Sequence, residues 1–137
     1  AVKDGKITVN GGEQWRPIIA VKDIAEYVVE ACEKKPNDTF ILSYKNTTIK
    51  ELGEKIAYLI PGTIINYIDM NFQDARNYKV YTSKADNYFN FKAKTTVEEE
   101  VLRMKKIFEE NRIKNTDLEL YNNGFYLQKL KEFNNFV

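Results

Sequence analysis

Apolar and polar positions near the start of the chain alternate with the period of a strand. Residues 6–9 (KITV) predict a short half-buried strand. The run Asn10-Gly11-Gly12 that follows predicts a turn. Residues 15–21 (WRPIIAV) are expected to be extended, since Pro17 restricts the residue before it to extended geometry.

The spacing then changes to that of a helix. Asp23 is expected to cap a helix, because a carboxylate before an apolar stripe is a common helix start. Its apolar residues, Ile24, Ala25, Val28, Val29 and Cys32, form a stripe of helical period. Residues 34–38 (KKPND) end this helix, and the apolar run at 39–43 (TFILS) is typical of a buried strand.

A capping box begins the next helix, since Thr48 is followed three residues later by Glu51. Its predicted apolar face is Leu52, Ile56, Leu59 and Ile60, and the helix stops at Pro61-Gly62. Residues 63–68 are rich in β-branched side chains and predict a strand. A polar loop at 71–77 and a short strand at 78–82 (YKVYT) come next, and Ser83 is expected to cap a brief helix.

A second capping box, Thr96 with Glu99, opens a helix whose apolar side carries Val97, Val101, Met104 and Phe108. The tail predicts a turn at 122–124 and a last amphipathic helix around residues 127–133. Strands and helices alternate along the chain. The predicted fold is therefore a mixed α/β arrangement, in which a small sheet of short strands packs with four to five helices.

Length and composition fit one domain: 137 residues, 43% hydrophobic and 30% charged. The net charge of +1 gives no reason to expect nucleic acid or an anionic membrane as a partner. With no histidine, Ser-His-Asp and Cys-His catalysis are excluded, and a single cysteine, Cys32, excludes an internal disulfide or a thiolate zinc site. A cytoplasmic setting is expected. The start at Ala1 is interpreted as a boundary inside a longer protein.

Arginine is scarce, and two of the four arginines occupy unusual places. Arg16 and Arg76 each sit where a loop meets a predicted strand. A guanidinium offers a planar fork of donors that matches phosphate oxygens in pairs, which lysine cannot do. The alternative is that each pairs with a nearby acid, Glu13 or Asp74. Asp74 itself could orient Arg76, accept a ligand hydroxyl, or cap a turn.

Four segments, taken in order, resemble extended short-chain dehydrogenase/reductases. Residues 11–25 (GGEQWRPIIAVKDIA) are similar to the family's Gly-x-Gln-x-Arg-(Asp/Pro) stretch with its following Val-x-Asp-(Val/Ile)-Ala. Residues 39–43 with the Thr48 helix stand where the family has a strand and helix. Residues 74–80 (DARNYKV) resemble the Asp-x-Arg-x-Tyr-x-Val loop, and 89–99 (FNFKAKTTVEE) resemble the segment that follows it. The Trp-Arg-Pro variant and the loop resemble the nucleotide-sugar epimerase/dehydratase branch.

The resemblance implies that residues 1–137 form the substrate-binding C-terminal part of a Rossmann-type epimerase or dehydratase. Arg16 and Arg76 then grip the diphosphate of a nucleotide sugar, with Asp74 beside them, and Val9 and Asn10 lie near the base. It also implies an N-terminal NAD-binding Rossmann domain outside this chain, which holds NAD or NADP and every catalytic residue. In the family the nicotinamide takes hydride from the sugar, and the keto intermediate is reduced again or loses water. A homo-oligomer is expected.

A second hypothesis is a stand-alone binding or interaction module with the same fold and no enzymatic activity. No Gly-x-x-Gly-x-x-Gly motif occurs in the sequence, so this chain by itself is expected to bind no dinucleotide and to catalyse nothing. The upstream coding sequence discriminates the two hypotheses. A glycine-rich strand–turn–helix followed by Tyr-x-x-x-Lys supports the enzyme, and a stop codon supports the module.

Overall fold

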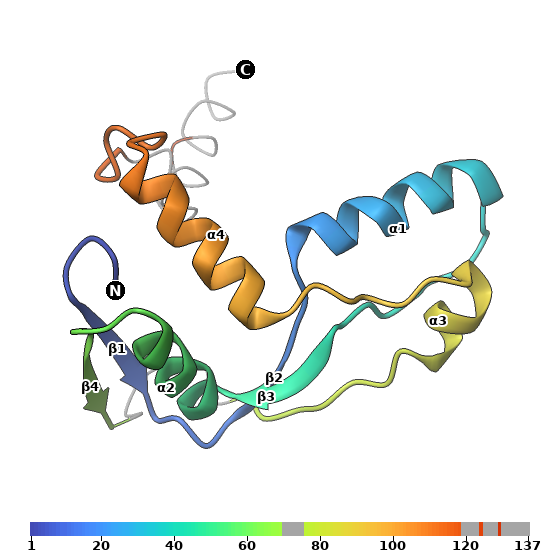
Figure 1. Cartoon of the computed structure of the whole chain (residues 1–137). Coiled ribbons are helices and arrows are strands. Elements are labelled where there is room, and N and C mark those ends of the chain that lie inside the picture. Colours follow the sequence, from blue (N-terminus) through green and yellow to red (C-terminus); the bar gives the residue numbers. More distant parts are fainter. Residues whose placement is uncertain (70–75, 119–123, 125–128, 130–137) are drawn as a thin grey trace. The chain divides into compact units, whose positions relative to one another are not determined.

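The computed structural model (Figure 1) describes residues 1–69, 76–118, 124 and 129. The chain divides into two compact units, Ala1–Lys106 and Ile107–Val137. The expected mixed α/β class is confirmed, with four helices and two small sheets among the described residues. The elements are β1 (Lys6–Asn10), β2 (Trp15–Ile18), α1 (Val21–Lys34), β3 (Lys45–Thr48), α2 (Ile49–Leu59), β4 (Ile64–Ile68), α3 (Ser83–Phe89) and α4 (Val97–Glu109). The predicted turn at 122–124 and the tail helix lie outside the described residues, apart from the helical Gly124 and Lys129.

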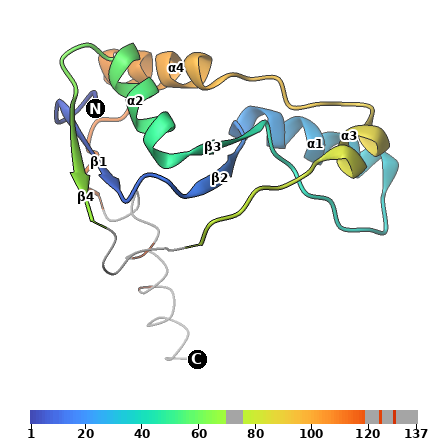
Figure 2. The same cartoon turned by 90° about the horizontal axis from the view of Figure 1, so that it is seen from below.

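The first sheet pairs β1 with β4 in parallel, from Lys6 opposite Ile64 to Asn10 opposite Ile68. Both strands are predicted by their patterns. Because they run parallel, both end at the same edge of the sheet (Figure 2). Helix α2 packs on this sheet at Gly53, where an added Cβ would lie only 2.7 Å from Cγ2 of Val9. Glycine thus lets the helix approach the strand closely, a contact that the predicted apolar face of the helix did not include.

The second sheet pairs β2 with β3 in antiparallel register, from Trp15 opposite Thr48 to Ile18 opposite Lys45. The predicted strand at 39–43 is wrong, because the structure assigns no strand there and places β3 after it. The partner strand β2 ends at Ile18, whose carbonyl accepts from the Tyr44 backbone N–H at 2.7 Å. Residues 39–43 lie beyond that point and have no strand to pair with, and two of their side chains, Phe40 and Leu42, pack against the hydrophobic core instead.

The main hydrophobic core lies between α1, α3 and the segment that follows α3. Its buried centre comprises Tyr27, Ala85, Phe89 and Ala93, and partly buried side chains around it are Ile19, Ala31, Phe40, Leu42, Tyr44 and Phe91. The Tyr27 ring meets the rings of Phe89 and Phe91 edge to face, with centroids 5.6 and 4.7 Å away. Edge-to-face contacts of this kind add stabilisation beyond the burial of apolar area.

The helix α1 is confirmed, but the apolar stripe seen in the sequence is not the face that is buried. Tyr27 and Asp23 are buried, whereas Val28, Val29 and Cys32 from the expected stripe are exposed, as is Val21. The predicted capping role of Asp23 is wrong, since the helix begins at Val21 with Ala20 as an N-cap that makes no side-chain bond. The helical period of the apolar positions is confirmed. The helix has apolar side chains on two faces, and the face with Tyr27 is buried while the face with Val28 and Val29 is exposed.

The exposed apolar face of α1 predicts self-association of the isolated chain. Val21 is 75% exposed, Val28 55% and Val29 59%, and Ile41 in the segment after the helix is 54% exposed. Apolar surface gathered on one helix face favours association. Light scattering should show oligomers that the double variant Val28→Lys, Val29→Glu converts towards monomer, with the net charge unchanged. The matched control Tyr58→Lys, on α2, should leave the oligomers in place; a monodisperse parent would contradict the prediction.

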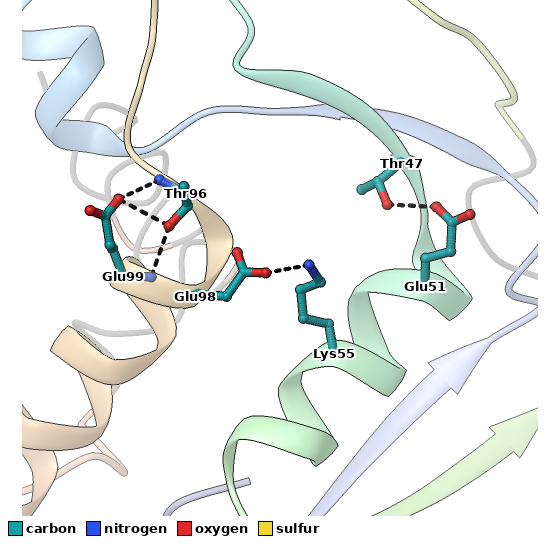
Figure 3. Close-up of polar contacts among 6 residues, drawn as sticks. All are labelled: Thr47, Glu51, Lys55, Thr96, Glu98 and Glu99. Carbon is teal, nitrogen blue, oxygen red and sulfur yellow. Dashed lines mark hydrogen bonds and ion pairs between the residues drawn. The ribbon is translucent and has the colours of Figure 1, made fainter.

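Both predicted capping boxes are confirmed, and Figure 3 shows the second, between Thr96 and Glu99. Thr48 Oγ1 accepts from the Glu51 N–H at 3.1 Å, and the Glu51 carboxylate accepts in return from the Thr48 N–H. Thr96 and Glu99 repeat this exchange at the start of α4. The backbone hydrogen bond from Thr48, joined by the Thr47 hydroxyl, lowers the pKa of Glu51. Each carboxylate accepts from its helix start, as a capping box requires.

Two expectations around α3 are wrong. Ser83 is the first residue of the helix rather than its cap, and the N-cap Thr82 instead directs its hydroxyl to Asp86 at 2.9 Å. Residues 78–82 are not a strand. The main-chain N–H and carbonyl of Val80 are instead met by one side chain of β3, that of Asn46.

In the second unit the structure describes the end of α4 and a turn that closes it. The Asn111 N–H donates to the Phe108 carbonyl at 3.0 Å, and the Arg112 N–H donates to Ile107 at 3.1 Å. Asn111 has a φ of 52°. Asparagine tolerates this left-handed conformation better than most residues, which suits it to the end of a helix.

Candidate functional site

The side chain of Arg16 contacts the main chain of Arg76, the other arginine singled out in the sequence. Nη1 of Arg16, in β2, donates to the main-chain carbonyl of Arg76 and, at 2.8 Å, to that of Trp15. The two arginines are 60 residues apart in sequence. The Arg16 guanidinium also lies over the Tyr78 ring, 5.5 Å from its centroid. Asp74, the predicted companion of these arginines, lies outside the described residues.

Residues 76–80 run beside the start of β2 and are attached to it by several contacts. The Trp15 N–H donates to Oδ1 of Asn77 at 3.0 Å, and the Tyr78 N–H approaches the Trp15 carbonyl at 3.5 Å. Nζ of Lys79 lies 3.5 Å from the centre of the Trp15 ring. Cations over aromatic faces are attracted by the ring quadrupole. The segment and the strand together therefore place Arg16 and Lys79 over two aromatic rings, with the main chain of Arg76 beside Arg16.

The turn between β1 and β2 is closed by Gln14. Its Oε1 accepts from the Gly12 N–H at 2.6 Å, and its Nε2 donates to the Asn10 carbonyl at 2.7 Å. Gly11 and Gly12 have φ of 70° and 126°, a region in which side chains are strained, so the predicted turn needs both glycines. The side chain of Gln14 fixes the path by which the chain passes from β1 to Arg16.

Two backbone N–H groups at the start of α2 donate to carbonyls of this turn. The Lys50 N–H donates to the Gly12 carbonyl at 2.9 Å, and the Ile49 N–H donates to the Gln14 carbonyl at 3.2 Å. A helix N-terminus binds anions through N–H groups that have no partner in the helix. Since these two amides already have partners, arginine side chains are the stronger candidates for holding an anion here.

The two remaining predicted residues lie at the end of β1. Asn10 is half-buried and is the last residue of the strand, opposite Ile68 at the end of β4. The side chain of Val9 is 2% exposed and packs against Gly53, so any contact of Val9 with a ligand would use its main chain. Ligands commonly bind at the carboxyl ends of parallel strands. Asn10 lies at such an end, a few residues before Arg16.

A groove of about 580 Å³ lies elsewhere in the first unit, and none of the five predicted ligand-binding residues lines it. Its walls come from β3, α2 and the start of α4: Lys45, Thr47, Glu51, Leu52, Glu54, Lys55, Tyr58, Leu59, Val97 and Glu98. An ion pair between Lys55 and Glu98 joins α2 to α4 beside it (Figure 3). The hydrogen bond from Lys55 lowers the pKa of Glu98. Two of the groove's charged side chains, Lys55 and Glu98, are thus occupied with each other.

Among the described residues, neither the glycine turn after β1 nor the acidic side chains form an arrangement typical of a dinucleotide or metal site. The parallel strand β1 leads through its glycine turn into a further strand, β2, rather than into the helix whose N-terminus would receive a pyrophosphate. No three acidic, cysteine or histidine side chains are grouped there as a metal site would need. Among these same residues no helix combines the length and apolar character of a membrane span.

Sequence reasoning missed two amides that shape this site. Asn77 lies in the polar loop read from the sequence, and Asn46 opens an Asn-x-Thr run whose pattern gives no sign of this contact. The side chain of Asn46 makes two hydrogen bonds with the main chain of Val80. An asparagine in a strand gives no signal of its own, because its partner is 34 residues away. Only the fold brings the two together.

No protein-family model matches the chain, and no curated protein matches it. Solved structures do match. The UDP-N-acetylglucosamine 4-epimerase from Methanobrevibacter ruminantium M1, solved with UDP-N-acetylmuramic acid, superposes with a TM-score of 0.68 at 26% identity, over 77% of this chain and 35% of that one. RMD from Pseudomonas aeruginosa, solved with NADPH, superposes with a TM-score of 0.65 at 12% identity, over 80% of this chain and 37% of that one.

The described fold is thus similar to part of a nucleotide-sugar epimerase. The chain spans little more than a third of the length of either solved structure, 35% and 37%. At 12% identity the likeness to RMD concerns the fold alone. The likeness to the 4-epimerase agrees with the resemblance seen in the four collinear segments of the sequence.

Proposed function

We propose that this chain is the nucleotide-sugar-binding portion of an NAD- or NADP-dependent epimerase or dehydratase of the extended short-chain dehydrogenase/reductase type. It grips the diphosphate with Arg16 and Arg76, and it is not catalytic alone. The cofactor and the catalytic residues belong, in this proposal, to an N-terminal Rossmann domain of a longer polypeptide. In this proposal the longer polypeptide is an isomerase or lyase that works by oxidation and reduction of the sugar. It acts in the cytoplasm.

The observation that carries the proposal is the meeting of Arg16 with the main chain of Arg76. Two guanidinium groups that start from neighbouring backbone can approach the same small anion from two directions. A diphosphate presents several oxygens to such a pair, and charge-assisted hydrogen bonds of this kind are about twice as strong as neutral ones. The 4-epimerase to which the chain is similar is solved with a UDP-sugar, which supports this ligand class.

Binding of the diphosphate would contribute to catalysis by position. Contacts to a part of the substrate that does not react can hold the sugar ring where the chemistry takes place. Asn10 and the main chain of Val9 stand at the adjoining strand end, where the base or ribose would lie, and Asp74 is assigned to the same site from its motif. None of these groups needs to move a proton for this role.

The test is calorimetric titration of the full-length protein with UDP-, GDP-, CDP- and dTDP-sugars. One of these series should bind, and Arg16→Ala and Arg76→Ala should each weaken it by about tenfold or more, because each removes charged hydrogen bonds. The matched control is Arg103→Ala, an exposed arginine on α4 that pairs with Glu100 at 2.7 Å. It should bind like the parent. Parental affinity in both site variants would refute the diphosphate role.

A further inference from the structure

The segment that carries Arg76 lacks a regular ladder and is held at its far end by one side chain. Nδ2 of Asn46 donates to the Val80 carbonyl at 3.0 Å, and Oδ1 of Asn46 accepts from the Val80 N–H at 2.9 Å. Asn46 lies in β3, opposite Pro17 of β2. A carboxamide offers a donor and an acceptor side by side, so it can satisfy both main-chain groups of one residue as a neighbouring strand would.

A second amide holds the near end of the segment. Oδ1 of Asn77 accepts from the Trp15 N–H at 3.0 Å. Between the two amide contacts lie Tyr78, under the guanidinium of Arg16, and Lys79, over the ring of Trp15. The two ends are thus fixed to different strands of one sheet, and the residues between them cannot slide along β2 without breaking one of the amide contacts.

We propose that Asn46 is a positioning residue for nucleotide-sugar binding: by clamping Val80 it orders residues 76–80 so that Arg76 stands beside Arg16 before the ligand arrives. This inference rests on the proposed function. A segment that is already ordered loses less conformational freedom on binding, so pre-ordering raises affinity without any contact to the ligand. Asn46 does not have to touch the ligand for this.

The experiment is a double-mutant cycle between Asn46→Ala and Arg76→Ala in the full-length protein, titrated with UDP-N-acetylglucosamine and with free UDP. Asn46→Ala should weaken binding about tenfold in the parent, since it removes both clamp bonds. In the Arg76→Ala background the same change should weaken binding less than about twofold, because little is left to position. A residue that merely stabilises the fold would weaken binding by the same factor in both backgrounds.

Two further variants separate the positioning role of Asn46 from a general effect on stability. Asn46→Asp has nearly the same shape and keeps the acceptor for the Val80 N–H but cannot donate to its carbonyl, so its binding should also weaken. Thr47→Val is the matched control: Thr47 is buried in the same strand, and its hydroxyl donates to Glu51 rather than to residues 76–80. It should lower the melting temperature and leave affinity near the parental value.

The outcomes separate this inference from the proposed function. If Arg76→Ala weakens binding but Asn46→Ala does not, or weakens it equally in both backgrounds, the positioning role is overturned and the diphosphate role stands. A loss of affinity in Thr47→Val equal to that in Asn46→Ala overturns the positioning role too. If Arg76→Ala binds both probes like the parent, the diphosphate role falls and the positioning role falls with it.

Discussion

Replacing Asp23 with alanine should lower the free energy of unfolding by about 3 kcal/mol, because three hydrogen bonds to a charged acceptor are lost in a buried place. The Asp23 carboxylate is 0% exposed. It accepts from the backbone N–H groups of Lys94 and Thr95 at 3.0 and 2.9 Å, and from the Thr95 hydroxyl at 2.6 Å. Urea denaturation of both proteins at neutral pH measures the difference.

The residues joined by Asp23 explain the size of this effect. They are 71 and 72 positions further along the chain, in the stretch between α3 and α4. Without the carboxylate, two main-chain donors face a cavity that only water can fill. The control is Asp38→Ala, which removes an exposed aspartate paired with Lys84 and should unfold close to the parent. Equal midpoints for the parent and Asp23→Ala would contradict the prediction.

Asp23 also makes the free energy of unfolding depend on pH, so that stability falls in acid. Burial acts to raise the pKa of its carboxyl group, but the hydrogen bonds from Thr95 and Lys94 outweigh burial, and the pKa is lowered from 3.8. The unfolded chain therefore takes up the proton first as pH falls. The stabilisation is fully present above the unfolded pKa and is lost as pH falls through the folded one. In Asp23→Asn this part of the acid dependence should be absent.

The sequence predicted the parts of the fold that depend on local signals. The capping boxes at Thr48 and Thr96, the glycine turn after β1, and the strands β1 and β4 follow from short patterns of residue type, whereas the parallel pairing of the strands does not. Such patterns work because the side chain and the main-chain group that it satisfies are three residues apart in sequence. The same logic assigned a cap to Asp23 and failed there, since its partners are far along the chain.

The remaining errors share this cause. The apolar run at 39–43 has the composition of a strand, but β2 ends before it can pair. Residues 78–82 were expected to be a strand, yet Val80 among them is held by the side chain of Asn46. At the site, composition singled out Arg16 and Arg76, and the fold brings them together. The amides that hold them there could not be found, because asparagine is common in loops and its long-range partners leave no local pattern.

Replacing Tyr27 with alanine should have the largest effect on stability, a loss of about 3–5 kcal/mol, as is typical when an aromatic side chain is removed from a core. Tyr27 is 2% exposed and stands at the centre of the cluster with Phe89 and Phe91. Its loss would leave a cavity bordered by two rings on the side of α1 that packs against α3. Tyr81→Ala is the control, because that ring is 89% exposed and its removal should leave the midpoint of unfolding unchanged.

Tyr27→Phe separates the ring from its hydroxyl. The hydroxyl is shared between Oδ1 of Asp86, at 3.2 Å, and the Phe91 carbonyl, at 3.3 Å, so the variant should lose only about 1 kcal/mol at neutral pH. Burial, with the hydrogen bond to Asp86 and its charge, raises the pKa of Tyr27 to about 12 from 10.0. The folded state therefore holds the proton longer as pH rises. Stability from this group is complete below pH 10.0 and declines towards about 12, so the parent should lose its advantage over Tyr27→Phe across that interval. A constant difference between the two proteins from neutral pH to pH 12 would show that the hydroxyl does not titrate in this way.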